Sequence, residues 1–251
     1  MSNRKKYGLV GKDISYSFSR DYFTKKFIEL NLKEHSYRNF DIPEIEEFPF
    51  LLYQKEDDYQ GLNVTIPYKE SIMKYLSEID EVAEKIGAVN TIKITEDNEL
   101  IGYNTDAYGF EKSLVKLLES HHKQALILGT GGASKAVAYV LEKLNIEYKF
   151  VSRSPNADQL TYDSLNETIL NESHLIINCT PLGTFPNIEL TPDIPYSYLT
   201  KKHLLYDLIY NPEETIFLKQ GRDKGAMIKN GSEMLKLQAE KSWEIWNASS
   251  Q

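Results

Sequence analysis

The chain has 251 residues, which suffices for one large domain or two modest ones, and its 41% hydrophobic and 26% charged residues are ordinary for a globular protein. Its formal net charge of -8 argues against broad nucleic-acid binding, because that binding needs Lys and Arg to neutralise phosphates. A single cysteine, Cys179, excludes an intrachain disulfide, and no apolar run approaches the roughly 18 residues of a membrane span, so we expect a cytoplasmic protein without nucleic-acid or membrane partners.

The first part of the chain alternates predicted strands and helices and then closes with a hairpin. Ser19 is positioned to cap the first helix, whose apolar residues recur at helical spacing. Strands are predicted at 7–11, 37–40 and 62–66, helices over 22–30 and 45–52, and the hairpin strands at 91–95 and 100–103.

A change of pattern near Asp106 marks the predicted domain boundary. An amphipathic stretch and a polar connection come next, and they lead to a strand, a glycine turn and a helix. Further strands are predicted at 125–128, 148–151, 175–177, 204–206 and 226–228, and helices at 133–144 and 232–246. The five histidines are scattered, and no His/Cys/Asp cluster has metal-ligand spacing, so we predict no metal.

The glycine turn is the first candidate site. Gly129, Gly131 and Gly132 stand where a dinucleotide pyrophosphate needs backbone amides at a helix N-terminus and no side chain in its way. Ser134 replaces the third glycine of the usual G-x-G-x-x-G pattern. Glycines alone could form a plain tight turn, but the flanking strand and helix favour a dinucleotide site.

The strand after this turn ends in Ser152-Arg153-Ser154 and carries no acid. NAD-specific folds usually place Asp or Glu there to hold the ribose 2'-hydroxyl. The planar guanidinium of arginine instead suits a 2'-phosphate. A solvated surface arginine is the simpler alternative, but the position of Arg153 favours NADP.

Polar residues without an evident structural reason also gather in the first part of the chain. The serines among them could form turns, Lys69 could be a solvated lysine, and Asp106 could cap the helix that follows it. The residues are Ser15, Ser17, Ser19, Asn63, Thr65, Lys69, Asn90, Asn104 and Asp106.

Taken with several other strings, these clusters resemble the shikimate dehydrogenase family. The strings occur in the order found in the family. They are GLNVTIPYK at 61–69, GAVNT at 87–91, GYNTDAYGF at 102–110, GTGGASKA at 129–136, NCTPLG at 178–183, DLIYNP at 207–212 and NGSEMLKLQA at 230–239.

The resemblance implies an α/β fold of two domains. Residues 1–105 and 230–251 would form an α/β substrate domain, and 106–229 a Rossmann-like, doubly wound parallel-sheet domain for NADP. The implied activity is that of an oxidoreductase of the chorismate pathway to aromatic amino acids, which reversibly reduces 3-dehydroshikimate to shikimate with NADPH. Monomer and homodimer both stay open.

The resemblance also assigns roles to single residues. Lys69 would be the catalytic general acid/base, with Asp106 as its partner. A lysine ammonium close to the ketone oxygen can donate a proton and stabilise the charge that develops there. The substrate-binding residues would be Ser17, Ser19, Thr65, Asn90, Asp106, Tyr210 and Gln238, and the cofactor-binding residues Gly129, Thr130, Gly131, Gly132, Ala133, Ser134, Ser152, Arg153 and Ser154.

The chain departs from the motifs of the family at a few positions. The first motif usually reads N-P-I-x-H-S-x-S-P. Here Asp13 replaces the first proline, Tyr16 replaces the histidine and Arg20 replaces the second proline. Ala157 stands where a second basic residue usually follows Arg153, so the phosphate contact would rest mainly on Arg153. Thr184 stands where Met is common.

Two other functions compete with this interpretation. A quinate/shikimate dehydrogenase would accept a further ring hydroxyl and often NAD, which Arg153 argues against. A catalytically silent paralogue would bind shikimate-like ligands only, but it would be expected to lose Lys69 or Asp106, and both are present.

Overall fold

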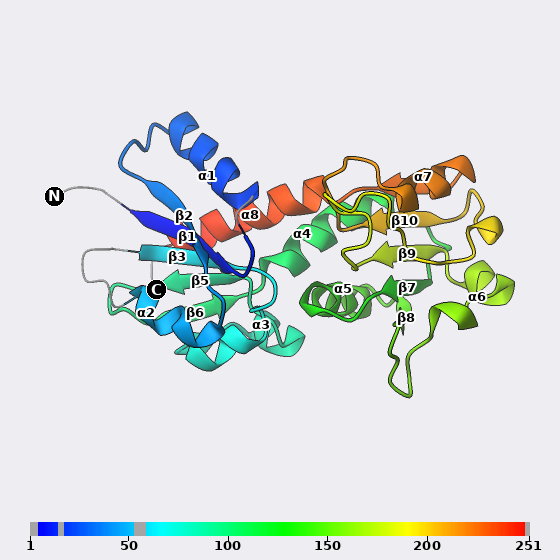
Figure 1. Cartoon of the computed structure of the whole chain (residues 1–251), viewed down its shortest axis with the longest axis horizontal. Helices are drawn as coiled ribbons and strands as arrows, with labels where there is room; N and C mark the ends of the chain where they lie inside the picture. The colour runs from blue at the N-terminus through cyan, green and yellow to red at the C-terminus, as the bar shows by residue number, and fades with distance from the viewer. Residues whose placement is uncertain (1–4, 15–17, 53–58, 249–251) are drawn as a thin grey trace. The chain divides into compact units, whose positions relative to one another are not determined.

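The computed structural model describes residues 5–14, 18–52 and 59–248, and the chain divides into two compact units. Unit 1 comprises Met1–Thr105 and Ala239–Gln251, and unit 2 comprises Asp106–Gln238. Each unit has its own β-sheet with helices packed on it, so the predicted α/β class is confirmed (Figure 1).

The sheet of unit 1 has six strands in the order β2-β1-β3-β5-β6-β4. β1 runs parallel to β2 and β3, whereas β3, β5 and β6 are successively antiparallel. The end of β3, the start of β5 and the end of β6 therefore meet at one edge of the sheet. The strands are β1 Lys6–Gly11, β2 Ser36–Asp41, β3 Tyr59–Val64, β4 Glu78–Ile79, β5 Thr91–Ile94 and β6 Leu100–Tyr103.

Both faces of this sheet are covered by apolar side chains. One core gathers Tyr7, Phe23 and Tyr37 with the indole of Trp246, whose Nε1 donates to the Ile92 carbonyl at 2.9 Å. The second core, around Phe48, Leu62 and Ile72, packs against the other face. The helices are α1 Phe18–Glu29, α2 Phe48–Leu52, α3 Glu81–Ile86 and the last turns of α8 Ser232–Asn247, with 3-10 turns η1 Ile45–Glu47 and η2 Ser71–Tyr75.

The sheet of unit 2 has five strands, all parallel, in the order β11-β10-β9-β7-β8. The chain starts at β7, adds β8 on one side, and then crosses to add β9, β10 and β11 on the other. This is a doubly wound order with its switch point between β7 and β9, so the predicted Rossmann-like fold is confirmed. The strands are β7 Gln124–Leu128, β8 Glu147–Val151, β9 Leu175–Asn178, β10 Leu204–Asp207 and β11 Met227–Lys229.

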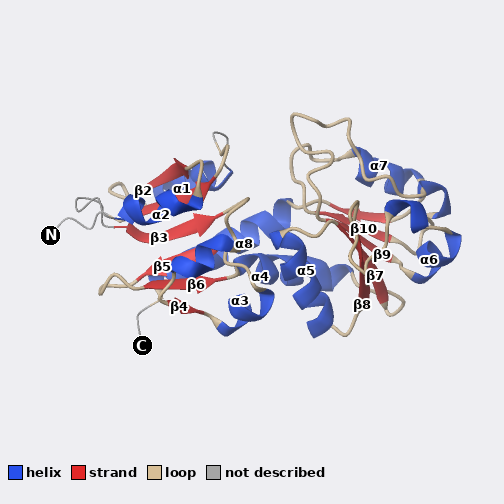
Figure 2. Ribbon diagram, turned by 60° about the horizontal axis from the view of Figure 1, so that its bottom comes forward, coloured by secondary structure: helices blue, strands red, loops and turns tan. Residues whose placement is uncertain are grey.

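Helices cover both faces of this sheet, with α5 on one face and α6 and α7 on the other (Figure 2). They are α4 Thr105–Leu114, which starts on the last residue of unit 1, α5 Gly132–Lys143, α6 Glu167–Glu172 and α7 Ile216–Asp223, with 3-10 turns η3 Val115–Leu117, η4 Tyr162–Ser164 and η5 Tyr196–Tyr198.

Helix capping explains three helices that the apolar spacing did not predict. Asp80 accepts from the Val82 amide before α3, Asn166 from the Ile169 amide before α6, and Thr215 from the Leu218 amide before α7. Ser19 does not cap α1 as expected, because the helix already begins at Phe18 and Ser19 lies in its first turn.

Four histidines from three separate parts of the chain gather at the amino edge of the unit 2 sheet, so in the fold they are not scattered. The ring centroids of His121 and His122 lie 4.3 Å apart, those of His121 and His174 5.3 Å, and those of His174 and His203 5.2 Å. Nδ1 of His122 and of His203 each accepts a backbone amide hydrogen, which fits buried, neutral rings. The edge opposite this cluster, where the strands end, carries the candidate cofactor residues.

Candidate active site

The glycine turn joins β7 to α5 at the switch point of the unit 2 sheet. Gly129 has φ 98°, a conformation that side chains rarely adopt, and a Cβ there would lie 3.0 Å from Thr180 Cγ2 at the end of β9. Gly131 is the N-cap of α5, and a Cβ at Gly131 would meet no atom within 4 Å. The helix amides of α5 therefore face a position that an anion could approach closely.

Ser134, which replaces the third glycine, is buried in the first turn of α5. Its hydroxyl donates to the Gly131 carbonyl at 2.6 Å, and its backbone amide donates to the same carbonyl at 2.9 Å. The hydroxyl is thus satisfied within the turn, which explains how serine is accommodated there.

Arg153 follows β8 at the same edge of the sheet and is exposed to solvent. Burial raises the pKa of the Tyr162 phenol, and the positive charge of Arg153 lowers it in part. The Ser154 amide donates to Ser152 Oγ at 3.2 Å, which shapes the turn that carries Arg153. Ala157 lies exposed further along this loop and provides no second cation.

The NCTPLG string forms the loop after β9, and a buried carboxylate anchors it. Asn178 Nδ2 donates to Asp207 Oδ1 at 3.0 Å, and Asn178 Oδ1 accepts from the Thr180 hydroxyl at 2.6 Å. Asp207 also accepts from the Ile209 amide at 3.0 Å and, through Oδ2, from the Thr215 hydroxyl at 2.6 Å. Burial raises the pKa of Asp207 to about 6 in spite of these hydrogen bonds.

The difference in the free energy of unfolding between the wild type and Asp207→Asn should depend on pH. A carboxyl whose pKa is raised by folding stabilises the native state when it is protonated, and this contribution is lost as the pH rises through about 6. The rise of the Asp207 pKa from the ordinary 3.8 to about 6 corresponds to about 3 kcal/mol of stability at most. Urea unfolding from about pH 4 to about pH 8 should therefore show the free energy of unfolding of the wild type falling against that of Asp207→Asn. A difference that stays constant with pH would contradict this, and the exposed Asp163→Asn is the matched control.

In unit 1, the strings VTIPYK and GAVNT are held together by backbone hydrogen bonds at the edge where β3 ends and β5 begins. The Val64 amide donates to the Asn90 carbonyl at 2.9 Å, and the Val89 amide donates to the Lys69 carbonyl at 2.7 Å. Thr65, Lys69 and Asn90 are therefore brought to one edge of the sheet. Thr65 and Lys69 are half-buried and Asn90 is buried.

The Asn90 side chain is fixed by the start of α4. Its Oδ1 accepts from the Thr105 amide at 2.7 Å and from the Thr105 hydroxyl at 3.1 Å. The amide oxygen of Asn90 is thus directed towards the start of α4. Asn104 has a structural role, because its Nδ2 donates to the Ala88 carbonyl at 2.9 Å.

Of the predicted carboxylate-binding serines, Ser19 is buried in the first turn of α1, whereas Ser17 lies outside the described residues. The loop that leads to them begins with Asp13 at φ 57°, and the Asp13 amide donates to Asp41 Oδ1 at 2.8 Å. A proline at this position could adopt neither this φ nor this hydrogen bond. The loop therefore starts with a backbone conformation that the proline of the usual family motif cannot adopt.

Asp106, Tyr210 and Gln238 come from segments of unit 2 that touch each other. Asp106 lies in the first turn of α4, one turn before Gly109, rather than in the N-cap position. A Cβ at Gly109 would lie 3.2 Å from the backbone nitrogen of Gln238, so α4 and α8 approach closely there. Tyr210 follows β10 in a segment tied to the start of α8 by the Gly231 amide, which donates to the Ile209 carbonyl at 2.9 Å.

Comparison with known proteins gives these residues a context. The sequence model of the family described as "Shikimate dehydrogenase substrate binding domain" matches residues 9–92. A shikimate dehydrogenase (NADP(+)) of Methanococcus maripaludis is 39% identical, over 98% of this chain and 92% of the relative.

Solved structures agree with this relationship. The chorismate mutase/shikimate 5-dehydrogenase fusion protein of Clostridium acetobutylicum superposes with a TM-score of 0.86 at 38% identity, covering 99% of this chain and 92% of that one. A shikimate dehydrogenase in complex with NADP+ gives a TM-score of 0.85 at 34% identity, covering 98% of this chain and 91% of that one. The chain therefore belongs to the shikimate dehydrogenase family.

Proposed function

We propose that the chain catalyses the reversible reduction of 3-dehydroshikimate to shikimate by NADPH, a step towards chorismate and the aromatic amino acids. The observation that carries this proposal is the 39% identity to a shikimate dehydrogenase (NADP(+)) over 98% of the chain. The strings that suggested the family include the residues gathered at the edge of the unit 1 sheet and at the carboxyl edge of the unit 2 sheet.

Each predicted domain has its own task in this proposal; the substrate domain is unit 1 together with residues 230–238, which the structure groups with unit 2. Residues 1–105 and 230–251 form the substrate domain, which is supported by the substrate-binding-domain match over 9–92. Residues 106–229 form the NADP domain, which is supported by the switch point between β7 and β9.

The residues of unit 2 fit NADP. The turn Gly129 to Ser134 binds the pyrophosphate, because the N-terminus of the 12-residue helix α5 presents backbone amides and a partial positive charge there. Exposed Arg153, flanked by Ser152 and Ser154, binds the 2'-phosphate. When bound, NADPH supplies the hydride that reaches the ring ketone.

On the substrate side, Ser17, Ser19 and Tyr210 hold the carboxylate, and Thr65, Asn90, Asp106 and Gln238 bind ring hydroxyls. Lys69 is the general acid/base: its ammonium donates a proton to the ketone oxygen during reduction and accepts it back during oxidation. The Asp106 carboxylate is its partner in this reaction.

The test is an assay of reduced-nicotinamide absorbance with the purified chain. Shikimate with NADP+ should give the fastest turnover. Faster turnover of quinate with NAD+ would point to a quinate/shikimate dehydrogenase, and no turnover of either acid would point to a ligand-binding paralogue.

A cytoplasmic location and a state of monomer or homodimer complete the proposal. None of the helices in the described part of the chain is long and apolar enough to cross a bilayer.

A further inference from the structure

The side chain of Asp207 connects two loops at the carboxyl edge of the unit 2 sheet. Asp207 and Asn178 are the last residues of the neighbouring strands β10 and β9, where they lie opposite each other and are fully buried. The loop 179–185 follows β9, and the segment 208–211, which carries Tyr210, follows β10. The hydrogen bonds of Asp207 reach both.

On the side of β9, the direction of each hydrogen bond can be assigned. The backbone amide of Thr180 can only donate, and it donates to Asn178 Oδ1 at 3.0 Å. The other end of the Asn178 amide is therefore Nδ2, which donates to Asp207 Oδ1 at 3.0 Å. The Thr180 hydroxyl also donates to Asn178 Oδ1, at 2.6 Å. Asp207 thus orients the Asn178 amide, and Asn178 holds Thr180.

Thr180 packs directly on the glycine turn. A Cβ at Gly129 would lie 3.0 Å from Thr180 Cγ2, so the methyl group limits any shift of the turn towards β9. Because Asn178 holds both the amide and the hydroxyl of Thr180, this methyl group has a fixed place. Thr180 therefore fixes one side of the turn that binds the pyrophosphate in the proposed function.

On the side of β10, the same carboxylate holds the segment that carries Tyr210. Asp207 Oδ1 accepts from the Ile209 amide at 3.0 Å, and Asp207 Oδ2 accepts from the Thr215 hydroxyl at 2.6 Å. Thr215 is the N-cap of α7, so the connection between β10 and α7 is held near both of its ends. Tyr210 follows Ile209 directly, and its backbone position depends on this turn.

We propose that Asp207 is a positioning residue for both ligands of the enzyme. Through Asn178 and Thr180 it fixes the turn that binds the pyrophosphate. Through the Ile209 amide it fixes Tyr210, which binds the substrate carboxylate. One buried carboxylate, which itself touches neither ligand, therefore sets the affinity for NADP+ and the affinity for shikimate together. This inference rests on the proposed function, because it requires that the glycine turn and Tyr210 bind these ligands.

The experiment is steady-state kinetics of shikimate oxidation by NADP+ with the full chain. Asp207→Leu keeps a similar branched shape but accepts no hydrogen bond. It should raise the KM for NADP+ and the KM for shikimate, each roughly threefold to tenfold, the effect of losing one hydrogen bond. The kcat should change less than about twofold, because the reacting groups are untouched.

Asp207→Asn is the conservative variant that should restore both affinities. Its Oδ1 still accepts from Asn178 and from the Ile209 amide, and its Nδ2 can donate to the Thr215 oxygen. Both KM values should therefore stay within about twofold of the wild type. A role in stability alone would give another result, because a partly unfolded preparation contains fewer active molecules, which lowers the apparent kcat and leaves both KM values unchanged.

Further variants separate the two sides. Thr180→Val removes the hydroxyl and should raise only the KM for NADP+, and Tyr210→Phe should raise only the KM for shikimate. Thr200→Val is the matched control, because the Thr200 hydroxyl lies 3.2 Å from His203 Nδ1, at the opposite edge of the same sheet. It should behave like the wild type.

Each result decides the matter. Unchanged KM values in Asp207→Leu, together with a raised KM for shikimate in Tyr210→Phe, would overturn the positioning role and leave the proposed function standing. Equal increases in Asp207→Leu and Asp207→Asn would also overturn it, because the hydrogen bonds would then not be the cause. An unchanged KM for shikimate in Tyr210→Phe would overturn the carboxylate role of Tyr210 and with it the substrate half of this inference.

A second variant covers the case in which Asp207→Leu does not fold. Thr215→Val removes one of the three hydrogen bonds that the Asp207 carboxylate accepts. It should raise both KM values in the same direction, and two unchanged values would refute the positioning role. A wild type that does not oxidise shikimate would instead refute the proposed function itself.

Discussion

Replacing Lys69 with methionine should lower kcat by roughly two to four orders of magnitude, the usual contribution of a positioned general acid. Methionine is unbranched and of similar length, so it fills the space of the lysine stem without carrying a transferable proton. The Lys69 carbonyl, which accepts from the Val89 amide, belongs to the backbone and is unaffected. The KM for shikimate should change only a few-fold, because the lost interaction forms chiefly in the transition state.

Steady-state kinetics in both directions would measure this effect. Lys74→Met is the control, since Lys74 is an exposed lysine of the same segment, paired with Glu46 at 3.0 Å. Near-normal turnover by Lys69→Met would refute the catalytic role. A raised KM with unchanged kcat would make Lys69 a binding residue instead.

Replacing Arg153 with glutamate should raise the KM for NADPH by roughly two orders of magnitude, the loss expected when a guanidinium–phosphate pair becomes a repulsion. NADH lacks the 2'-phosphate, so its KM should change little. The ratio of the two KM values therefore isolates the 2'-phosphate from any general damage to the domain. Stability should be preserved, because Arg153 is exposed at the end of β8.

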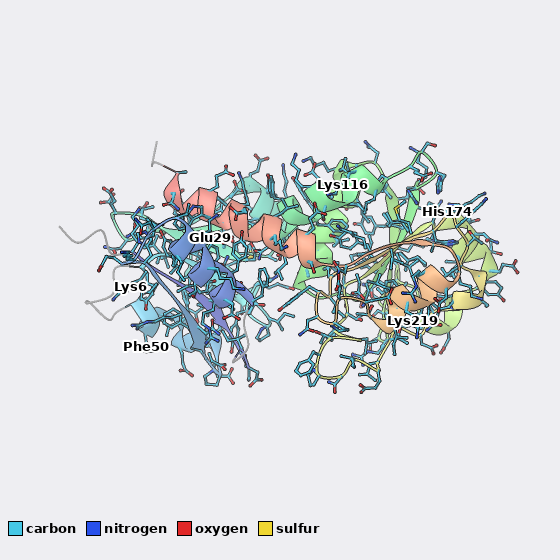
Figure 3. All side chains as sticks on the ribbon, turned by 90° about the horizontal axis from the view of Figure 1, so that it is seen from above. Lys6, Glu29, Phe50, Lys116, His174 and Lys219 are labelled. Carbon is cyan, nitrogen blue, oxygen red and sulfur yellow. The ribbon has the colours of Figure 1, made fainter. Side chains whose placement is uncertain are left out.

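The matched control for this charge reversal is Lys219→Glu. Lys219 is an exposed cation on α7, in the same unit (Figure 3). It should leave both KM values unchanged. If Arg153→Glu raised the KM for NADH as much as that for NADPH, the assignment to the 2'-phosphate would be lost.

Much of the fold could be predicted from local signals. The run of apolar residues in β7, the glycines after it and the apolar face of α5 all indicate a strand, a turn and a helix. This strand-turn-helix segment was therefore predictable without any relative. The short helices α3, α6 and α7 were missed, although Asp80, Asn166 and Thr215 are recognisable caps in the sequence. Short helices bury few residues, so their apolar period is too brief to detect.

The candidate site was less accessible to sequence reasoning. Thr65, Lys69 and Asn90 meet at one edge because β3 and β5 pair in antiparallel register, which no local pattern encodes. Asn63 was an equal candidate for substrate binding in the sequence. In the structure its side chain is hydrogen-bonded to Tyr37, Thr91 and Ser242. Only the family resemblance assigned Lys69 and Asp106 to one reaction.

Unit 1 is discontinuous in the chain, and this has a consequence for the order in which the protein can fold during synthesis. Its aromatic core needs Trp246, whose indole donates to the Ile92 carbonyl, and Trp246 leaves the ribosome after the whole of unit 2. Unit 2 is one uninterrupted segment and can close as soon as that segment has emerged. The strands made first must therefore wait, with one face of their sheet covered by α1 but not yet by Trp246, for a helix made later, and during this interval the nascent chain is open to aggregation.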